Sequence, residues 1–524
     1  MNNTSEIRLS NIKKNIKGAV ILKVVTVLSV FATRTVIIRT LGTAYLGLNS
    51  LFVSLIQILN IAELGFGSAV VYFLYKPIAE NDTVTVNALL KLCQTAYRLA
   101  GLAIFILGIV MIPFLPKLIK NGVPDELNLT ILYLIYLIET CLSYFLFSYR
   151  AVLLEASQQK AVISYINAVA KIVLSIVQIL ILLLCGNYYI FCFAQIIVQV
   201  FINISIYVAT KKLFPQYRCE GKVPKEDAKR IYKTVGALFI NKVGLALRNS
   251  FDSIILSAFV GLDILGIYQN YLLILTTLKD TTSILLESST AGIGNSIATE
   301  SIEKNYKDFC SFQLVFMWLC GTITVCMACV YQPFMRFWIG AENLFPDRLM
   351  LIFPVYFFTE RMGAVCYLYR SAAGLWWEER FRPVVDGIVN IVLNIILVKK
   401  IGIAGVMLST IICQIFIDAL WGSYTLFNFY FKDYSRGKYL IRLGIFGIVT
   451  SAAEALCYFI CRQISLSFSI LLVIAACGFV CVLISQIIFC NIYRFLPEYQ
   501  QAKKLFGSFL RFPKSSKLQA NTDL

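Results

Sequence analysis

The sequence predicts an all-α, polytopic membrane protein with about 14 transmembrane helices. Of its 524 residues, 59% are hydrophobic and only 15% are charged, whereas ordinary soluble domains carry about 25% charged residues. Apolar stretches long enough to cross a bilayer recur along the whole chain. The polar segments between them are too short to build a core of their own. These three observations exclude a soluble multidomain protein.

A hydropathy window of about 19 residues locates the expected spans. The second span carries Gly65 and Gly67, which predict a bend. Residues 78–97 and 295–309 are expected to form separate amphipathic helices on the membrane surface. The spans lie at approximately 18–40, 45–75, 99–119, 127–149, 161–185, 187–209, 235–260, 264–290, 311–333, 346–370, 382–401, 403–427, 439–461 and 467–492.

Loop charge predicts the orientation of these spans. With the N-terminus inside, most of the 47 Lys and Arg residues fall in inner segments, as the positive-inside rule requires. Both termini are then cytoplasmic, and the first span is retained because no small-residue cleavage site follows it. The outer loops carry only Lys117, Lys120, Arg336, Arg348, Lys399, Lys400 and Arg462.

An internal repeat divides the chain. Residues 41–48 (LGTAYLGL) resemble residues 260–267 (VGLDILGI), an offset of 219, and shorter matches follow in the same order. Each repeat holds six spans, so the halves are related by a pseudo-twofold axis along the membrane normal. The predicted parts are an N-terminal lobe (1–210), a basic cytoplasmic linker (211–234), a C-terminal lobe (235–430), two extra spans (431–493) and a basic cytoplasmic tail (494–524).

Composition also excludes several kinds of chemistry. The chain has no His, which removes His-based zinc sites, Ser-His-Asp triads and His proton relays. We interpret the 16 Cys, including the CxxC pair Cys326 and Cys329, as small apolar residues and predict no metal. The outer loops are too short to hold an active site, so we expect no catalytic residue and no enzyme. The net charge of +18 reports membrane topology rather than nucleic-acid binding.

Eight basic residues lie inside predicted spans, where each would cost roughly 2.5–3.5 kcal/mol or more if it faced lipid. We therefore expect some of them to line a wet cavity for an anionic ligand. The candidates are Lys23, Arg34, Arg39, Lys171, Lys242 and Arg248; the other two are Lys279 and Arg361.

The positions of these candidates within their helices predict different roles for them. Lys23 and Arg34 point to nearly the same side of the first span, and the depth of Arg34 favours the cavity, whereas Lys23 and Arg39 could equally extend to the interfaces. Lys171 and Lys242 have no acidic neighbour three or four residues away, which points to a ligand or water. Arg248 could instead form an ion pair within its own helix, with Asp252.

Acidic residues inside the spans form a second set. Such a residue can bind Na⁺ or exchange H⁺ to drive transport, although most are expected to neutralise basic residues on other helices. The coupling-ion candidates are Asp386, Asp418, Asp252 and Glu63, of which Asp386 and Asp418, on the eleventh and twelfth predicted spans, are preferred. No other cofactor is expected.

Two stretches point to a family. Residues 41–49 (LGTAYLGLN) and 60–69 (NIAELGFGSA) closely resemble the Wzx-type polysaccharide flippases of the multidrug/oligosaccharidyl-lipid/polysaccharide exporter superfamily. The resemblance implies a two-lobed bundle in the bacterial cytoplasmic membrane. It also implies alternating-access translocation of an undecaprenyl-diphosphate-linked oligosaccharide for surface polysaccharide biosynthesis. The basic cavity residues that it implies map to Arg34 and Arg39.

Two other functions stay open. Peptidoglycan lipid-precursor flippases share the span count and a basic cavity. Multidrug cation antiporters of the same superfamily usually have twelve spans, and an excess of cavity Lys and Arg would repel their substrates. The expected partners are a lipid-linked anionic oligosaccharide and the lipid bilayer, with a polymerase and glycosyltransferases as further candidates and no nucleic acid.

Overall fold

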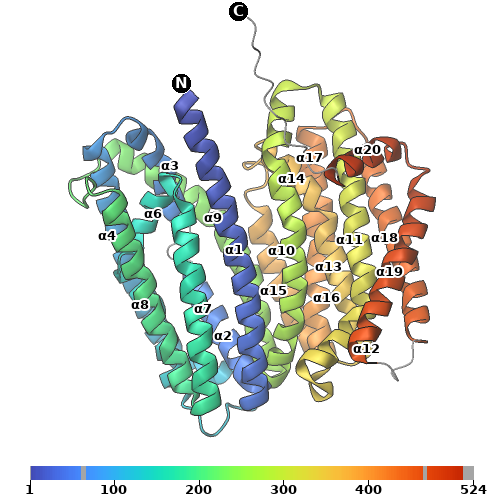
Figure 1. Ribbon diagram of the computed structural model, residues 1–524, viewed down its shortest axis with the longest axis horizontal. Helices are drawn as coiled ribbons and strands as arrows, with labels where there is room; N and C mark the ends of the chain where they lie inside the picture. The colour runs from blue at the N-terminus through green and yellow to red at the C-terminus, as the bar shows by residue number, and fades with distance from the viewer. Residues whose placement is uncertain (1, 61–65, 464–468, 511–524) are drawn as a thin grey trace, which may run out of the picture. The chain divides into compact units, whose positions relative to one another are not determined.

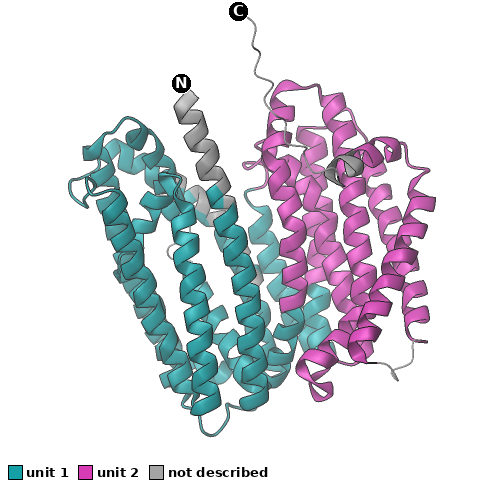
Figure 2. Ribbon diagram, in the orientation of Figure 1, with its two compact units in different colours: residues 1–272, 380–409 teal, residues 273–379, 410–524 magenta. Residues whose placement is uncertain are grey.

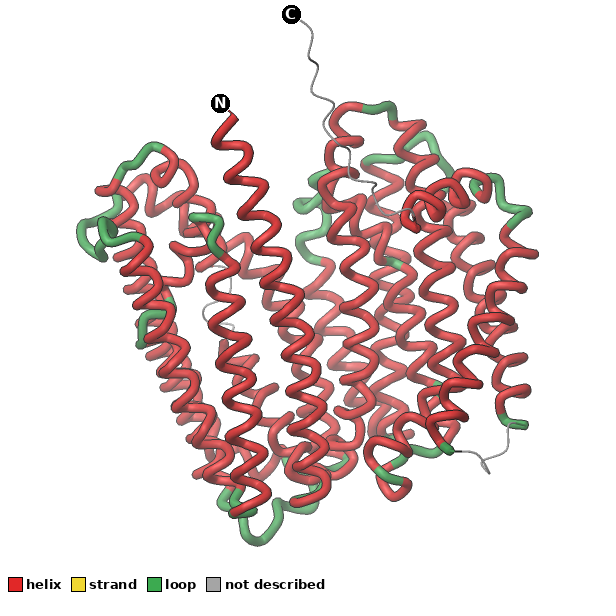
Figure 3. Tube along the Cα trace, viewed as in Figure 1, coloured by secondary structure: helices red, strands yellow, loops and turns green. Residues whose placement is uncertain are grey.

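The computed structural model describes residues 2–60, 66–463 and 469–510, and within these ranges every regular element is a helix (Figures 1 and 3). The all-α, polytopic fold predicted from the sequence is confirmed. Nine helices of the described chain are long and apolar enough to span a bilayer, or ten if the bent pair α5 and α6 forms one span. The count of fourteen stays a prediction.

The elements follow one another in this order: α1 Asn2–Thr40, α2 Thr43–Leu59, α3 Phe66–Ala79, α4 Thr83–Met111, the 3₁₀ helix η2 Ile112–Leu118, α5 Leu129–Phe145, α6 Tyr149–Ala156, α7 Lys160–Leu184, α8 Tyr188–Leu213, α9 Lys225–Phe259, α10 Leu262–Thr299, α11 Ile302–Ile339, the 3₁₀ helix η3 Ala341–Asn343, α12 Asp347–Met350, α13 Ile352–Met362, α14 Ala364–Ala372, α15 Arg382–Ile401, α16 Ile403–Cys413, the π-helix η4 Gln414–Trp421, α17 Gly422–Phe429, α18 Arg436–Cys461, α19 Ile470–Tyr493 and α20 Tyr499–Leu510.

The chain forms two compact units (Figure 2). Unit 1 comprises residues 1–272 and 380–409, and unit 2 comprises residues 273–379 and 410–524. Within unit 1, α1 packs along α7, and α9 packs along α15. Within unit 2, α11 packs against α13, α18 and α19. The division into lobes at residues 211–234 stays a prediction.

The two stretches that resemble each other in sequence also contact each other, inside unit 1. A Cβ atom added to Gly47 would lie 2.0 Å from the backbone oxygen of Leu262, and one added to Gly266 would lie 2.1 Å from that of Thr43. At the offset of 219 residues, Thr43 corresponds to Leu262 and Gly47 to Gly266. The contact is therefore reciprocal, as a two-fold axis requires. Beside it, the Thr43 hydroxyl donates to Asp263 Oδ1 at 2.8 Å.

The two separate surface helices expected from the sequence are not formed. The Asp82 carboxylate accepts a hydrogen bond from Thr85 N at 3.0 Å and starts α4, which then continues into the apolar region without a break. Ser301 caps α11 in the same way, accepting from Lys304 N at 3.3 Å. A single cap starts each long helix, and no Pro or Gly separates the amphipathic part from the spanning part. That part of the prediction is wrong.

The bend expected in the second span lies partly on residues that the structure does not describe. Helix α2 ends at Leu59 and α3 begins at Phe66, with Gly67 in its first turn. Gly65 lies outside the described residues.

Candidate functional site

Unit 1 contains a cavity of about 490 Å³, bounded by α1, α2, α5, α7 and α8. Its volume falls in the range of small-molecule sites, about 300–1,000 Å³. Three charged side chains line it, one from each of three helices: Arg34 on α1, Glu139 on α5 and Lys171 on α7. Uncharged polar groups supply further donors and acceptors, among them Thr26, Thr33, Asn49, Asn167, Gln195 and Gln199.

The polar lining comes from regular stripes on apolar helices. On α1, Thr26, Thr33 and Arg34 lie on the same helical side, and on α7 the spacing from Asn167 to Lys171 is one turn. On α8, Gln195 and Gln199 repeat that spacing. Each helix therefore faces the cavity with its polar stripe.

Arg34 is partly buried and has no carboxylate partner in the described chain. Its Nη1 atom donates to the backbone oxygen of Gln269 at 2.6 Å and to Asn270 Oδ1 at 3.3 Å, both on α10 and within unit 1. These neutral acceptors hold one end of the guanidinium but leave its charge uncompensated. Because a guanidinium carries five N–H donors in a planar fork, the remaining donors can bind a phosphate or carboxylate ligand.

Lys171 and Glu139 interact electrostatically across the cavity. No ion pair within 4.0 Å joins them in the part of the chain that the structure describes. Lys171 thus offsets the negative charge of Glu139 without closing the cavity. With Arg34 included, the three charged groups leave the lining with one excess positive charge.

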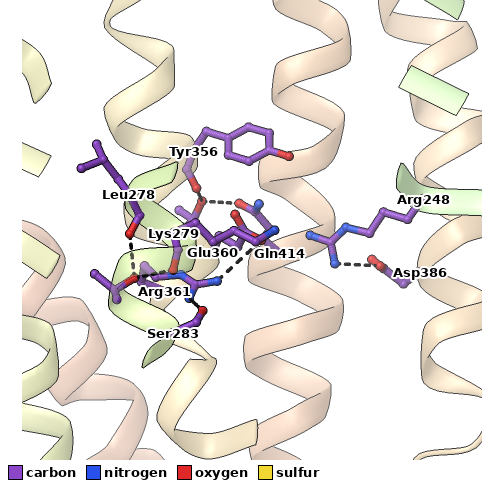
Figure 4. Close-up of polar contacts among 11 residues, drawn as sticks. Arg248, Leu278, Lys279, Ser283, Tyr356, Glu360, Arg361, Asp386 and Gln414 are labelled. Atoms are coloured by element: carbon purple, nitrogen blue, oxygen red, sulfur yellow. Dashed lines mark hydrogen bonds and ion pairs between the residues drawn. The ribbon is translucent and has the colours of Figure 1, made fainter. Parts of the chain in front are cut away.

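The other basic candidates lie elsewhere. Lys23 and Arg39 are exposed on α1, and Lys242 is half-buried on α9; none of the three lines this cavity. Arg248, also on α9, donates from Nη1 to Asp386 Oδ2 on α15 at 2.9 Å (Figure 4). Of the six candidates, the structure brings Arg34 and Lys171 together in the cavity.

Asp252 lies in a buried polar cluster formed by α9, α15 and α16. Asn394 Nδ2 donates to Asp252 Oδ1 at 2.6 Å and to Asn390 Oδ1 at 3.0 Å. The hydroxyl of Ser409 donates to Asn394 Oδ1. All four residues are at least nine-tenths buried. The cluster gathers carboxylate, amide and hydroxyl oxygens, which are the ligands that hard cations prefer.

The remaining coupling-ion candidates are placed less favourably for that role. Asp386 has Arg248 as a counter-ion. Asp418 is half-buried in the π-helix η4 of unit 2. Glu63 lies outside the described residues.

The other two intramembrane cations share one carboxylate in unit 2 (Figure 4). Lys279 Nζ lies 2.7 Å from Glu360 Oε1, and Arg361 Nη2 lies 3.7 Å from the same oxygen. Arg361 Nη1 also donates to the Ser283 hydroxyl at 3.1 Å. These contacts stabilise the packing of α10 against α13, and Glu360 is the counter-ion of both Lys279 and Arg361.

Sequence reasoning expected intramembrane carboxylates such as Glu139 to neutralise basic residues on other helices, but it did not identify Lys171 as the partner of Glu139 and it missed the uncharged polar lining. The signal was present, because the polar residues of α1, α7 and α8 recur at intervals of one or two helical turns inside apolar spans.

Solved structures of similar fold are transporters. A lipid II flippase, MurJ, in an inward closed conformation matches with a TM-score of 0.64 at 16% sequence identity, over 92% of this chain and 98% of that one. An inward-facing MATE family multidrug resistance transporter of the MOP superfamily matches with a TM-score of 0.59 at 14% identity, over 76% of this chain and 94% of that one.

The Vibrio cholerae MATE transporter VcmN, in its bent form, matches with a TM-score of 0.52 at 12% identity, over 85% of this chain and all of that one. This chain has the fold that MurJ and the MATE transporters share. It is a multi-pass membrane protein. No protein-family model and no curated protein matches the sequence.

Proposed function

We propose that the protein is a flippase that translocates an undecaprenyl-diphosphate-linked oligosaccharide across the bacterial cytoplasmic membrane for surface polysaccharide biosynthesis. The observation that carries the proposal is the cavity of unit 1, where Arg34 presents an uncompensated guanidinium inside an apolar helical bundle. Such a charge is costly at membrane depth unless it meets water or an anion.

The chemistry of the lining suits a sugar diphosphate. The free edge of the Arg34 guanidinium can bind phosphate oxygens in a bidentate manner, and Lys171 can approach them as a point charge. Amide side chains such as Gln195 and Gln199 can bind sugar hydroxyls. The polyprenyl chain stays in the lipid, and alternating access carries the head group from the inner to the outer side.

A peptidoglycan lipid precursor is the second candidate substrate, and the structural likeness to a lipid II flippase favours it. It carries the same anionic diphosphate, so the lining described above does not separate the two. A multidrug cation fits less well, because two basic groups oppose the single carboxylate of Glu139.

We propose Asp252 as the residue that binds the coupling ion, Na⁺ or H⁺. It is buried among Asn390, Asn394 and Ser409, whose oxygens could complete a cation site. Asp386 is less suited, because Arg248 already neutralises it at 2.9 Å.

The decisive experiment compares Arg34→Ala with Arg39→Ala in a strain that lacks its oligosaccharide flippase, at matched protein levels. Both changes remove one Arg from α1, but only Arg34 lines the cavity. We expect Arg34→Ala to abolish complementation and Arg39→Ala to preserve it. Full complementation by Arg34→Ala would contradict the proposal.

A reconstituted assay then identifies the substrate. The purified protein is placed in liposomes with undecaprenyl-diphosphate-linked oligosaccharide, with lipid II or with a fluorescent organic cation. Arg34-dependent translocation of only the oligosaccharide lipid supports the proposal. Transport of only lipid II would identify a peptidoglycan lipid-precursor flippase instead, and transport of only the organic cation would identify a multidrug antiporter.

A further inference from the structure

Six cysteines of unit 2 gather on three helices that pack against one another, α11, α18 and α19. All six are free thiols, and five of them are buried while Cys326 is partly exposed. Each helix contributes two: Cys326 and Cys329 from α11, Cys457 and Cys461 from α18, Cys477 and Cys481 from α19.

Three of these thiols form a compact triangle. The Sγ atoms of Cys329, Cys461 and Cys481 all lie within 4.8 Å of one another, and those of Cys461 and Cys481 are 3.9 Å apart. Cys326 precedes Cys329 by three residues on α11, and Cys457 precedes Cys461 by four on α18, so each lies about one helical turn from the triangle. The group could therefore supply three or four ligands.

The spacing matches sulfurs that share a metal ion. A zinc–sulfur bond of about 2.3 Å places two sulfurs of a tetrahedron about 3.8 Å apart. A disulfide would require about 2.05 Å. Small side-chain rotations would therefore bring the triangle to metal-binding geometry.

A second cavity, of about 220 Å³, reaches this group. Cys329, Cys461 and Cys477 line it, together with Arg336 and Arg462. It gives an ion a path to the sulfurs and gives the thiol protons a way out. The cavity is also lined by the Asp347 carboxylate, so Arg336 and Arg462 leave it with one excess positive charge, which offsets part of the negative charge that thiolates would bring into an apolar bundle.

We propose that Cys329, Cys461 and Cys481 bind a thiophilic metal ion, Zn²⁺ or Cu⁺, with Cys326 or Cys457 as a fourth ligand. Thiolates are the ligands that select these ions. Each ligand thiol loses one proton to the cavity as the sulfur–metal bond forms, so binding strengthens as the pH rises. The site lies wholly in unit 2 and is separate from the cavity that contains Arg34.

The test uses the full-length protein, purified under reducing conditions and stripped of metal. It is titrated with Zn²⁺, with Cu⁺ and with Co²⁺ as a spectroscopic probe. We expect about one ion per chain, and we expect Co²⁺ to give the thiolate charge-transfer and visible bands of a tetrahedral sulfur site.

The variant Cys461→Ser/Cys481→Ser should lower bound metal at least about tenfold. The matched control is Cys185→Ser/Cys490→Ser, which changes two exposed cysteines outside the cluster and should bind as the wild type does. Bound Zn²⁺ should also protect Cys461 of the wild-type protein from maleimide, a readout that does not depend on the folding of a variant.

Equal metal binding by the wild type and the cluster variant would overturn the proposal. Failure of Zn²⁺ and Cu⁺ to protect Cys461 would do the same. So would disulfides among the six cysteines in protein isolated without reductant, since they would identify a redox pair instead.

Discussion

Replacing Gly47 by Ala should force apart the two repeat-related stretches of unit 1. The added Cβ atom would lie 2.0 Å from the backbone oxygen of Leu262, whereas real Cβ atoms essentially never approach closer than 3.0 Å. Helices α2 and α10 must therefore separate by at least about 1 Å. The obstacle is a backbone carbonyl of a helix, so no side-chain rotation relieves it.

Two opposing effects determine how much the free energy of unfolding changes. Overpacking of this kind costs about 1–3 kcal/mol, and a rigid backbone obstacle places the cost near the upper end. Ala gains about 1 kcal/mol over Gly in a helix. The net loss of unfolding free energy is then about 2 kcal/mol. Gly266→Ala should lose as much, because its Cβ would lie 2.1 Å from the backbone oxygen of Thr43.

The assay is thermal unfolding of the purified full-length protein, followed by tryptophan fluorescence and size-exclusion chromatography. Gly444→Ala is the matched control, since Gly444 lies in the exposed face of α18 with nothing within 4 Å of an added Cβ. We expect both close-contact variants to melt below the wild type and the control to melt at or above it. The double variant should lose less than the sum, because one separation accommodates both methyl groups. A Gly47→Ala protein as stable as Gly444→Ala would refute the reasoning.

Three further experiments test other contacts. Arg248→Ala should cost about 3–5 kcal/mol because it removes the cation 2.9 Å from the buried Asp386 carboxylate. Arg248→Ala/Asp386→Asn should recover part of the loss in the same melting assay, and equal melting of the single and double variants would count against the pair. Lys171→Ala should weaken binding of the diphosphate lipid about tenfold or more, and Glu139→Gln should strengthen it, as measured by titration in nanodiscs. Asp252→Asn should abolish cation-driven flipping in liposomes while head-group binding persists, and unchanged cation dependence would remove Asp252 from that role.

Hydropathy predicted the fold well because the lipid phase imposes one simple requirement, an apolar helix that satisfies its own backbone. It failed at residues 78–97 and 295–309, where polarity marks the ends of long helices rather than separate ones. The local signal was the absence of Pro and Gly between the amphipathic and apolar parts of α4 and of α11, which leaves nothing to end either helix there.

The candidate site could be predicted only in part. Arg34 and Lys171 could be recognised because an unpaired charge inside a span needs an explanation. The partner of Arg248 could not, since Asp386 is 138 residues away and meets it only through the packing of α9 on α15. The cysteine cluster is a second example. Cys329 of the CxxC pair meets Cys461 and Cys481 only through the packing of α11 against α18 and α19.

The reciprocal contact of Gly47 and Gly266 bears on how such a chain could arise. Residues 43–47 present to residues 262–266 the same close contact that they receive, so two identical polypeptides could meet in this way without any specialised partner. A gene encoding one half could thus have yielded a working homodimer before duplication and fusion joined the copies. Once they were joined, mutations on the axis would be tolerated chiefly in compensating pairs, which makes these positions a place to look for covariation among homologues.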